Sequence, residues 1–229
     1  MNNNTQVTYG LLITIAIFLI AAFAGNLINL NHPFILNSFV THTTMLLLSI
    51  VVIYSFKKRV NYKICIPKLR TIFKPILFGL LATVVVNVSM AAITGGLDGN
   101  QEAHPLIEKA SPIQVFLFIF IYASIAEELL FRGFLMNILQ PLKTKEINIL
   151  KRRLSLPVII SAVAFGLAHL ILITAGASGL LILRVVVFTT VLGLIAGYYQ
   201  EKYDNNAYAI IVHMAGNWFG FVAAVMMSQ

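Results

Sequence analysis

The chain has 229 residues, of which 59% are hydrophobic and 10% are charged. Its mean hydropathy of +0.89 lies above that of soluble globular domains and indicates a polytopic membrane protein. Because a transmembrane helix needs about 20 apolar residues, the chain has room for about seven spans with short connections. We therefore predict an all-α fold, a transmembrane helix bundle in a lipid bilayer, without a separate soluble domain.

The net charge of +8 comes largely from two clusters of basic residues, one between residues 57 and 74 and one between residues 143 and 153. Lys and Arg beside apolar runs mark the cytoplasmic side of a membrane protein, and this pattern argues against nucleic acid as a partner. It predicts a cytoplasmic N-terminus and a C-terminus on the outside. The single cysteine, Cys65, excludes an intrachain disulfide and a cysteine-based metal site. Together with the short loops, it is typical of a prokaryotic plasma-membrane protein.

Seven apolar runs follow one another along the chain. They cover about residues 9–30, 39–56, 76–93, 114–139, 157–174, 180–199 and 207–227. The connection before the fourth run is the most acidic one, with Asp98, Glu102, His104, Glu108 and one base, Lys109. We expect this connection on the outer side. A single integral membrane domain then consists of residues 1–113, with three spans and the outer loop, and residues 114–229, with the four spans that carry the candidate catalytic residues.

The fourth run contains three charges, Glu127, Glu128 and Arg132. A charge at the centre of a span costs roughly 2.5–3.5 kcal/mol, whereas each large aliphatic or Phe residue returns only about 0.3–0.6 kcal/mol. Glu128 and Arg132 are four residues apart and share one helix face, so we predict that they form an ion pair. Glu127 is left without this partner, and an unpaired carboxylate inside a membrane is a functional-site candidate.

Two further spans carry polar residues in helical pairs, Phe165 with His169 and His213 with Asn217. At a rise of about 1.5 Å per residue, these residues and Glu127 lie roughly 9–18 Å from the cytoplasmic surface, so they can meet if their spans are neighbours. We expect a site that opens toward the cytoplasmic half of the bilayer. His32, His42 and His104 lie near predicted loops, and we expect no catalytic role for them.

A carboxylate and an imidazole can together deprotonate a water, and an imidazole with a carboxamide can donate hydrogen bonds to an oxyanion. Hydrolysis of a peptide bond needs both functions. The predicted cluster therefore fits a hydrolase that acts on peptides.

Three motifs in this order, Glu127-Glu128-Leu129-Leu130-Phe131-Arg132, Phe165-x-x-x-His169 and His213-x-x-x-Asn217, resemble those of the CaaX-protease and bacteriocin-processing family of intramembrane endopeptidases. This family includes the eukaryotic type II CAAX prenyl endopeptidase and many bacterial Abi proteins. The resemblance extends roughly from Gln114 to Met227, about half of the chain.

The resemblance implies a role for each motif residue. Glu127 and His169 would activate the water, and His213 and Asn217 would form the oxyanion hole. Glu128 and Arg132 would be a supporting ion pair, and Phe165 would shape the pocket. The implied substrate is a peptide or a membrane-associated protein; eukaryotic members cleave prenylated proteins, but nothing in this sequence shows that it uses one.

The family has been described both as metalloprotease and as glutamate-type protease. Glu127, His169 and His213 could ligate zinc together with a water. However, the chain has no His-Glu-x-x-His helix, and Asn217 suits an oxyanion better than zinc, so we predict no metal cofactor.

Two other functions remain open from the residues alone. A non-catalytic membrane immunity or scaffold protein could retain the motifs. A proton-coupled transporter would also hold Glu, His and Arg inside the membrane, but the chain lacks repeated halves with broken helices.

Overall fold

The computed structural model describes residues 2–94, 110–149 and 152–228. Within these ranges, seven helices are long and apolar enough to cross a membrane, which confirms the predicted all-α bundle. They are Asn3–Leu27, Ser38–Ser55, Leu69–Ile93, Pro112–Met136, Leu156–Ala175, Gly179–Tyr203 and Ala207–Met227. The predicted outer loop with Asp98, Glu102, His104, Glu108 and Lys109 lies outside the described residues.

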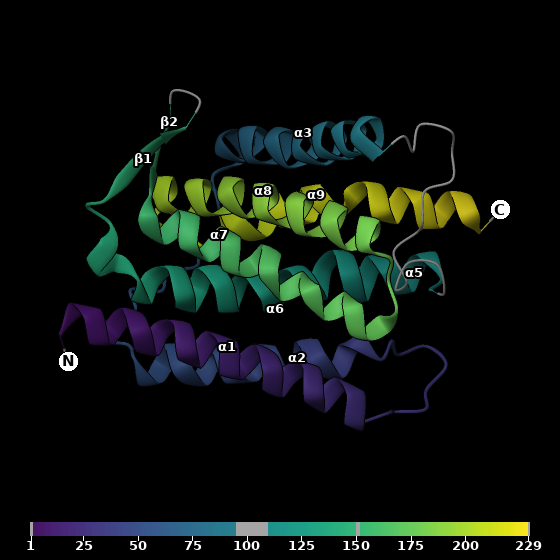
Figure 1. The fold of residues 1–229 in the computed structure, drawn as a ribbon, viewed down its shortest axis with the longest axis horizontal. Helices are drawn as coiled ribbons and strands as arrows, with labels where there is room; N and C mark the ends of the chain where they lie inside the picture. The colour runs from purple at the N-terminus through teal and green to yellow at the C-terminus, as the bar shows by residue number, and fades with distance from the viewer. Residues whose placement is uncertain (1, 95–109, 150–151, 229) are drawn as a thin grey trace.

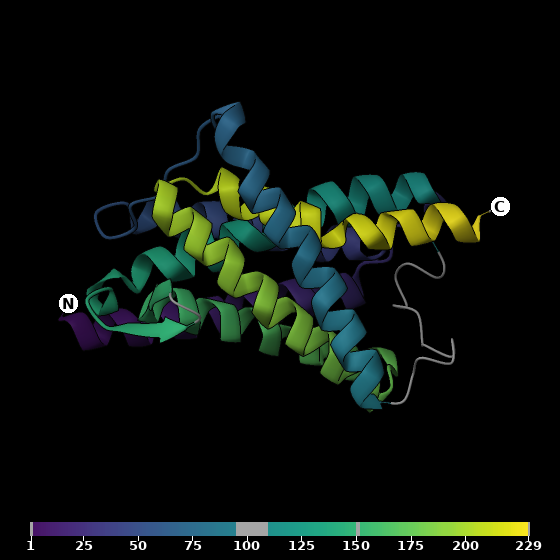
Figure 2. The same ribbon diagram turned by 90° about the horizontal axis from the view of Figure 1, so that it is seen from above.

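The helices are stacked in four layers (Figure 1). Helices α1 (Asn3–Leu27) and α2 (Ser38–Ser55) pack on the fourth span, which lies beside α7 (Leu156–Ala168). Helices α8 (Gly179–Tyr203) and α9 (Ala207–Met227) form the next layer, and α3 (Leu69–Thr94) crosses them on the far side (Figure 2). The fourth span is therefore in the interior of the bundle, where neighbouring helices can compensate its charges.

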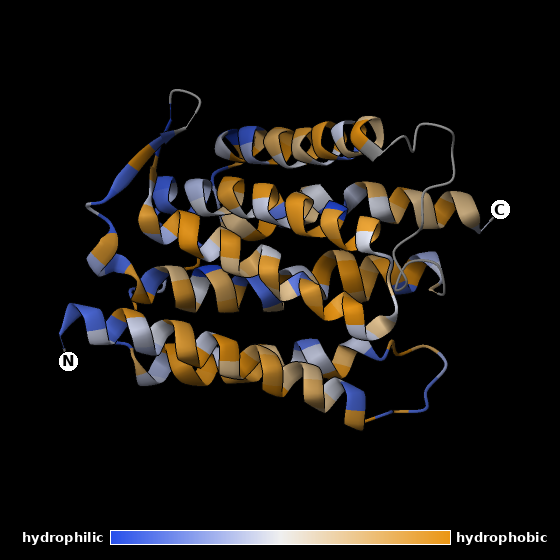
Figure 3. Cartoon of the chain, in the orientation of Figure 1, coloured by the Kyte–Doolittle hydropathy of each residue, from blue (hydrophilic) through white to orange (hydrophobic). Residues whose placement is uncertain are grey.

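Hydrophobic residues predominate along the middle of the helices, and hydrophilic residues gather at the ends of the bundle (Figure 3). Large side chains such as Leu12, Phe23 and Leu81 are exposed. An apolar surface of this extent would be unfavourable in water, and it is the surface that a lipid bilayer requires.

The two basic clusters lie at one end of the bundle, which we call the basic end. The first cluster is anchored to the turn between α8 and α9: Lys63 forms an ion pair with Asp204, and Asn205 donates to the carbonyl oxygen of Cys65 over 2.9 Å. The second cluster contains a feature that the sequence analysis did not predict, a hairpin of β1 (Glu146–Ile149) and β2 (Arg152–Ser155). The opposite end, which carries residues 28–37 and 176–178, is called the distal end.

Several predicted boundaries differ from the observed ones. The first span begins at Asn3 rather than near residue 9. The third span begins at Leu69 rather than near residue 76, so Arg70 and Lys74 belong to the helix instead of the loop. Long basic side chains at a helix end can extend their charged groups to the membrane surface, so a basic stretch does not have to be a loop. The sixth span ends at Tyr203 rather than near Tyr199.

The fourth span is not a regular α-helix. A short α-helix, α6 (Ser124–Glu128), lies between two π-helical segments, η2 (Val115–Ala123) and η3 (Leu129–Met136), after a first turn α5 (Pro112–Gln114). Two side chains donate hydrogen bonds to a backbone carbonyl group within the π-helical part. Asn137 and Gln200 donate to the Arg132 carbonyl oxygen over 2.9 and 2.8 Å. π-Helical turns occur frequently at functional sites, and here they flank the two glutamates.

Helix α3 approaches α9 closely through Gly79. A Cβ atom at this position would lie 2.6 Å from the carbonyl oxygen of Val212 and 2.8 Å from Cβ of Ala215. Nearby, the Thr83 hydroxyl donates to the Gly216 carbonyl oxygen over 2.8 Å. The small residue thus allows contact between the two helices.

We predict that Gly79→Val lowers the free energy of unfolding by about 1–3 kcal/mol, because the added side chain overpacks this interface. Steric trapping in detergent micelles measures this quantity. Gly179→Val is the matched control, because nothing lies within 4 Å of a Cβ atom there, and we expect it to change stability by less than about 0.5 kcal/mol. Equal stability of the two variants would contradict the described α3–α9 packing.

Candidate active site

The centre of the bundle contains the predicted ion pair. Nη1 of Arg132 donates to Oε1 of Glu128 over 2.9 Å, and the two side chains are 0% and 1% exposed. The ring of Phe165 lies 4.5 Å from the guanidinium carbon of Arg132. Gly193 in α8 leaves room for this group, since a Cβ atom there would lie 2.4 Å from Nη2 of Arg132. The pair is therefore held between α7 and α8, away from water.

His213 connects this pair to Glu127. Its Nδ1 atom lies 2.9 Å from Oε1 of Glu128, and its Nε2 atom lies 3.8 Å from Oε2 of Glu127. Because an ionised carboxylate only accepts hydrogen bonds, Nδ1 carries a proton that it donates to Glu128. Glu128 thus fixes the ring of His213 in addition to pairing with Arg132.

His42 contacts the candidate site, although the sequence analysis did not include it there. It lies in the first turns of α2, is buried, and its Nε2 atom is 3.2 Å from Oε1 of Glu127. His42 is thus close to the loop before α2, as expected, but it also lies beside a predicted catalytic residue. The sequence contained an indication of this contact, because His42 lies inside an apolar run and is as unusual there as His169 or His213 in their spans.

His169 and Asn217 reach the same region from α7 and α9. His169 ends α7 and begins the 3₁₀ segment η5 (His169–Ala175), and its Nδ1 atom is 2.9 Å from the carbonyl oxygen of Phe165. The Nδ2 atom of Asn217 donates to the hydroxyl of Ser124 over 3.3 Å. Ser124 is completely buried and donates in turn to the Phe120 carbonyl oxygen, a supporting contact that the sequence analysis did not identify.

Side chains of four predicted catalytic residues line one cavity of about 530 Å³: Glu127, His169, His213 and Asn217. His42 and Phe165 also line it. The structure thus brings together the residues that the three motifs contain. Glu128 and Arg132 lie behind this wall, against His213 and Phe165.

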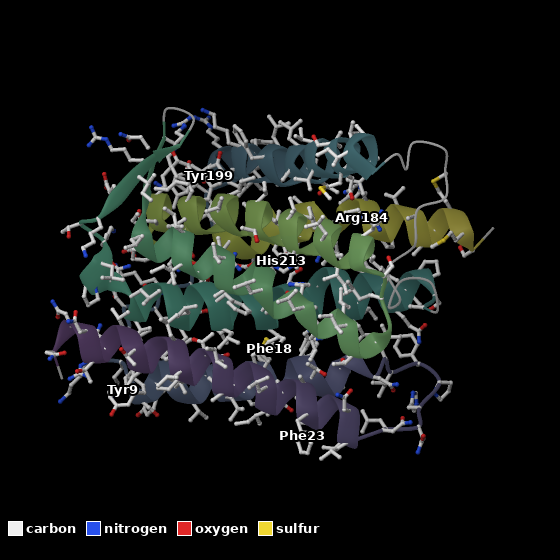
Figure 4. The ribbon with its side chains drawn as sticks, viewed as in Figure 1. Tyr9, Phe18, Phe23, Arg184, Tyr199 and His213 are labelled. Carbon is white, nitrogen blue, oxygen red and sulfur yellow. The ribbon has the colours of Figure 1, made fainter. Side chains whose placement is uncertain are left out.

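The cavity extends from Glu127 toward the distal end. Its lining includes Asn26, Ser38 and Arg184, which are close to the distal ends of α1, α2 and α8. Figure 4 shows His213 near the middle of the bundle and Arg184 nearer the end that carries the C-terminus.

The cavity therefore does not extend toward the basic end, the end for which the sequence analysis predicted a cytoplasmic location and the opening of the site. On that side of Glu127, the interior is filled by buried apolar side chains of the fourth span and the residues that follow it, including Leu130, Leu135 and Leu139. The depth of a residue along its own helix could be estimated from the sequence. The sequence could not show on which side of Glu127 the packing of side chains leaves a cavity.

Among the described residues, no group of three or more His, Cys, Asp and Glu side chains is arranged to hold a metal ion. The possible zinc ligands Glu127, His169 and His213 line one cavity but do not form such a set here. The lack of a metal cofactor stays a prediction.

Residues 109–219 match the family of type II CAAX prenyl endopeptidases described as Rce1-like. The match begins just before the fourth span, ends within α9, and contains the motif residues from Glu127 to Asn217. Helices α1, α2 and α3 lie outside it. Comparisons with curated proteins and with solved structures gave no match.

We predict that Arg132→Met lowers the free energy of unfolding by about 3–5 kcal/mol, because it removes the guanidinium counter-charge of the buried Glu128 carboxylate. Lys63→Met removes the basic partner of an exposed ion pair with Asp204, and we expect a loss of less than about 1 kcal/mol. Steric trapping of both variants in the same micelles makes the comparison. A similar loss in both would show that the Glu128–Arg132 pair is not a structural requirement.

Proposed function

We propose that Glu127 and His169 activate the water that attacks a peptide bond. The chain belongs to the Rce1-like type II CAAX prenyl endopeptidase family through residues 109–219, and this family implies a membrane protease. The observation that carries this proposal is the shared cavity, which is lined by the Glu127 carboxylate from the interior of a span together with His169, His213 and Asn217. Burying these polar groups together inside a membrane is costly, and catalysis is a reason to retain them.

The hydrogen bonds of His169 suit it to a basic role. A carbonyl oxygen only accepts, so the contact with the Phe165 carbonyl oxygen puts a proton on Nδ1 of His169. In the neutral ring, Nε2 then carries a lone pair that can take a proton from water. Glu127 lines the same cavity with its carboxylate and would share this deprotonation.

The oxyanion would be stabilised from α9. His213 and Asn217 are one helical turn apart and both line the cavity. With Nδ1 of His213 bound to Glu128, a proton on Nε2 would make an imidazolium that can donate to the oxyanion and whose charge Glu127 and Glu128 balance. The amide nitrogen of Asn217 has two hydrogens, so one can bind Ser124 while the other faces the substrate.

The substrate in this proposal is a peptide or a membrane-associated protein with an apolar segment. Much of the cavity wall is apolar, with Phe18, Met45, Leu172 and Phe188 among its residues. We propose a cytoplasmic N-terminus and an outside C-terminus in a prokaryotic plasma membrane, because the basic clusters gather at one end of the bundle. The cavity then opens toward the outer half of the bilayer.

We predict that Glu127→Gln, His169→Ala and His213→Ala abolish cleavage of a quenched peptide library by the purified protein, because each removes a group that moves a proton or binds the oxyanion. Asn217→Ala should lower kcat by about 10²–10³-fold, the usual cost of one oxyanion donor. Glu146→Gln in the exposed hairpin is the matched control and should cleave normally. Full activity of Glu127→Gln would overturn the mechanism, and cleavage by none of the proteins would favour a scaffold.

We also predict that exhaustive chelation leaves cleavage unchanged, because neither proton transfer nor oxyanion binding in this mechanism uses a metal. The rate is measured before chelation, after chelation, and after zinc is added back. Activity that disappears with chelation and returns with zinc would instead make Glu127, His169 and His213 zinc ligands.

A further inference from the structure

We propose that His42 of α2 is a positioning residue for Glu127 and that a helix outside the family-matched region thereby completes the active site. This inference rests on the proposed role of Glu127 as a base. The geometry that carries it is the contact of 3.2 Å between Nε2 of His42 and Oε1 of Glu127. Both side chains are largely buried, with 10% and 16% exposed.

The contact gives the two carboxylate oxygens of Glu127 different neighbours. An ionised carboxylate only accepts, so Nε2 of His42 donates to Oε1. The other oxygen, Oε2, lies on the side of His213, with 3.8 Å to its Nε2 atom. Oε1 is thus held by α2, and Oε2 is the atom that would accept the proton of the attacking water.

His42 has no competing partner within the described part of the chain. Its Nδ1 atom is buried and makes no hydrogen bond there. A buried nitrogen with only a lone pair is less costly than a buried N–H group without an acceptor, which favours the tautomer with its proton on Nε2. In this form, the hydrogen bond to Glu127 is the interaction that the ring can donate.

Helix α2 is itself fixed against the fourth span beside His42. The hydroxyls of Thr43 and Tyr122 lie 2.8 Å apart, and the rings of Phe39 and Tyr122 stack with centroids separated by 5.2 Å. These contacts hold the backbone of α2 at the level of Glu127. His42 therefore approaches the carboxylate from a rigid element, as precise positioning of a catalytic group requires.

Kinetics of His42 variants test the role in positioning. His42→Leu removes the donor and should lower kcat by about 10- to 100-fold, the range for losing a hydrogen bond to a charged group, with KM little changed. His42→Gln can place an amide N–H near Oε1 and should recover most of kcat. His32→Gln, in the exposed turn between α1 and α2, is the control and should match the wild type. Equal kcat values for His42→Leu and the wild type would overturn the proposal.

A second measurement separates this proposal from the proposed function. In protein labelled with ¹⁵N-histidine, Glu127→Gln should move the ring-nitrogen resonance of His42 and leave that of His32 unchanged, whether or not the protein cleaves the chosen peptides. A His42 resonance that does not respond to Glu127→Gln would overturn the contact. Wild-type protein that cleaves nothing but shows the shift would count against the proposed function and retain the contact.

Discussion

Charge compensation inside a membrane span constrains the architecture of this bundle. Glu127, Glu128 and Arg132 lie within one apolar helix, where each charge alone costs several kcal/mol. The ion pair of Glu128 and Arg132 is buried at 1% and 0% exposure, so it requires partners on every side. The guanidinium of Arg132 packs on the ring of Phe165 in α7, and Gly193 in α8 leaves space for it. His213 in α9 donates a hydrogen bond to Glu128. The fourth span consequently lies in the interior of the stack, with α1 and α2 on one side and α7 and α9 on the other.

The same arrangement links stability to chemistry. Glu128 binds Arg132 and fixes Nδ1 of His213, so one structural carboxylate orients a ring that lines the cavity. Glu127, its neighbour in sequence, faces that cavity and is held by His42 from α2. Adjacent residues of a helix point in different directions, and this difference lets two neighbouring glutamates have separate roles, one in holding the bundle together and one in the proposed attack of water on a peptide bond.

Much of this organisation could be predicted from the sequence, and the reasons for the failures are physical. Seven apolar runs and the spacing of Glu128 and Arg132 are local properties, and both appear in the structure. The contact of His42 with Glu127 joins residues 85 positions apart, and nothing local marks it except a polar residue in an apolar run. The π-helical turns depend on side chains such as Gln200, which donates to the Arg132 carbonyl oxygen from another helix. The direction in which the cavity extends depends on which side of Glu127 is filled by apolar side chains, and this is a property of the packed bundle.

The central claim is that Glu127 serves catalysis whereas Glu128 serves the fold. The measurement that tests it most directly is the free energy of unfolding of Glu127→Gln and Glu128→Gln in the same detergent micelles. We predict a loss of about 3–5 kcal/mol for Glu128→Gln, which leaves Arg132 buried without its counter-charge. We predict a much smaller change for Glu127→Gln, since it removes no partner of Arg132. Equal destabilisation by the two substitutions would make Glu127 a structural residue and contradict the account.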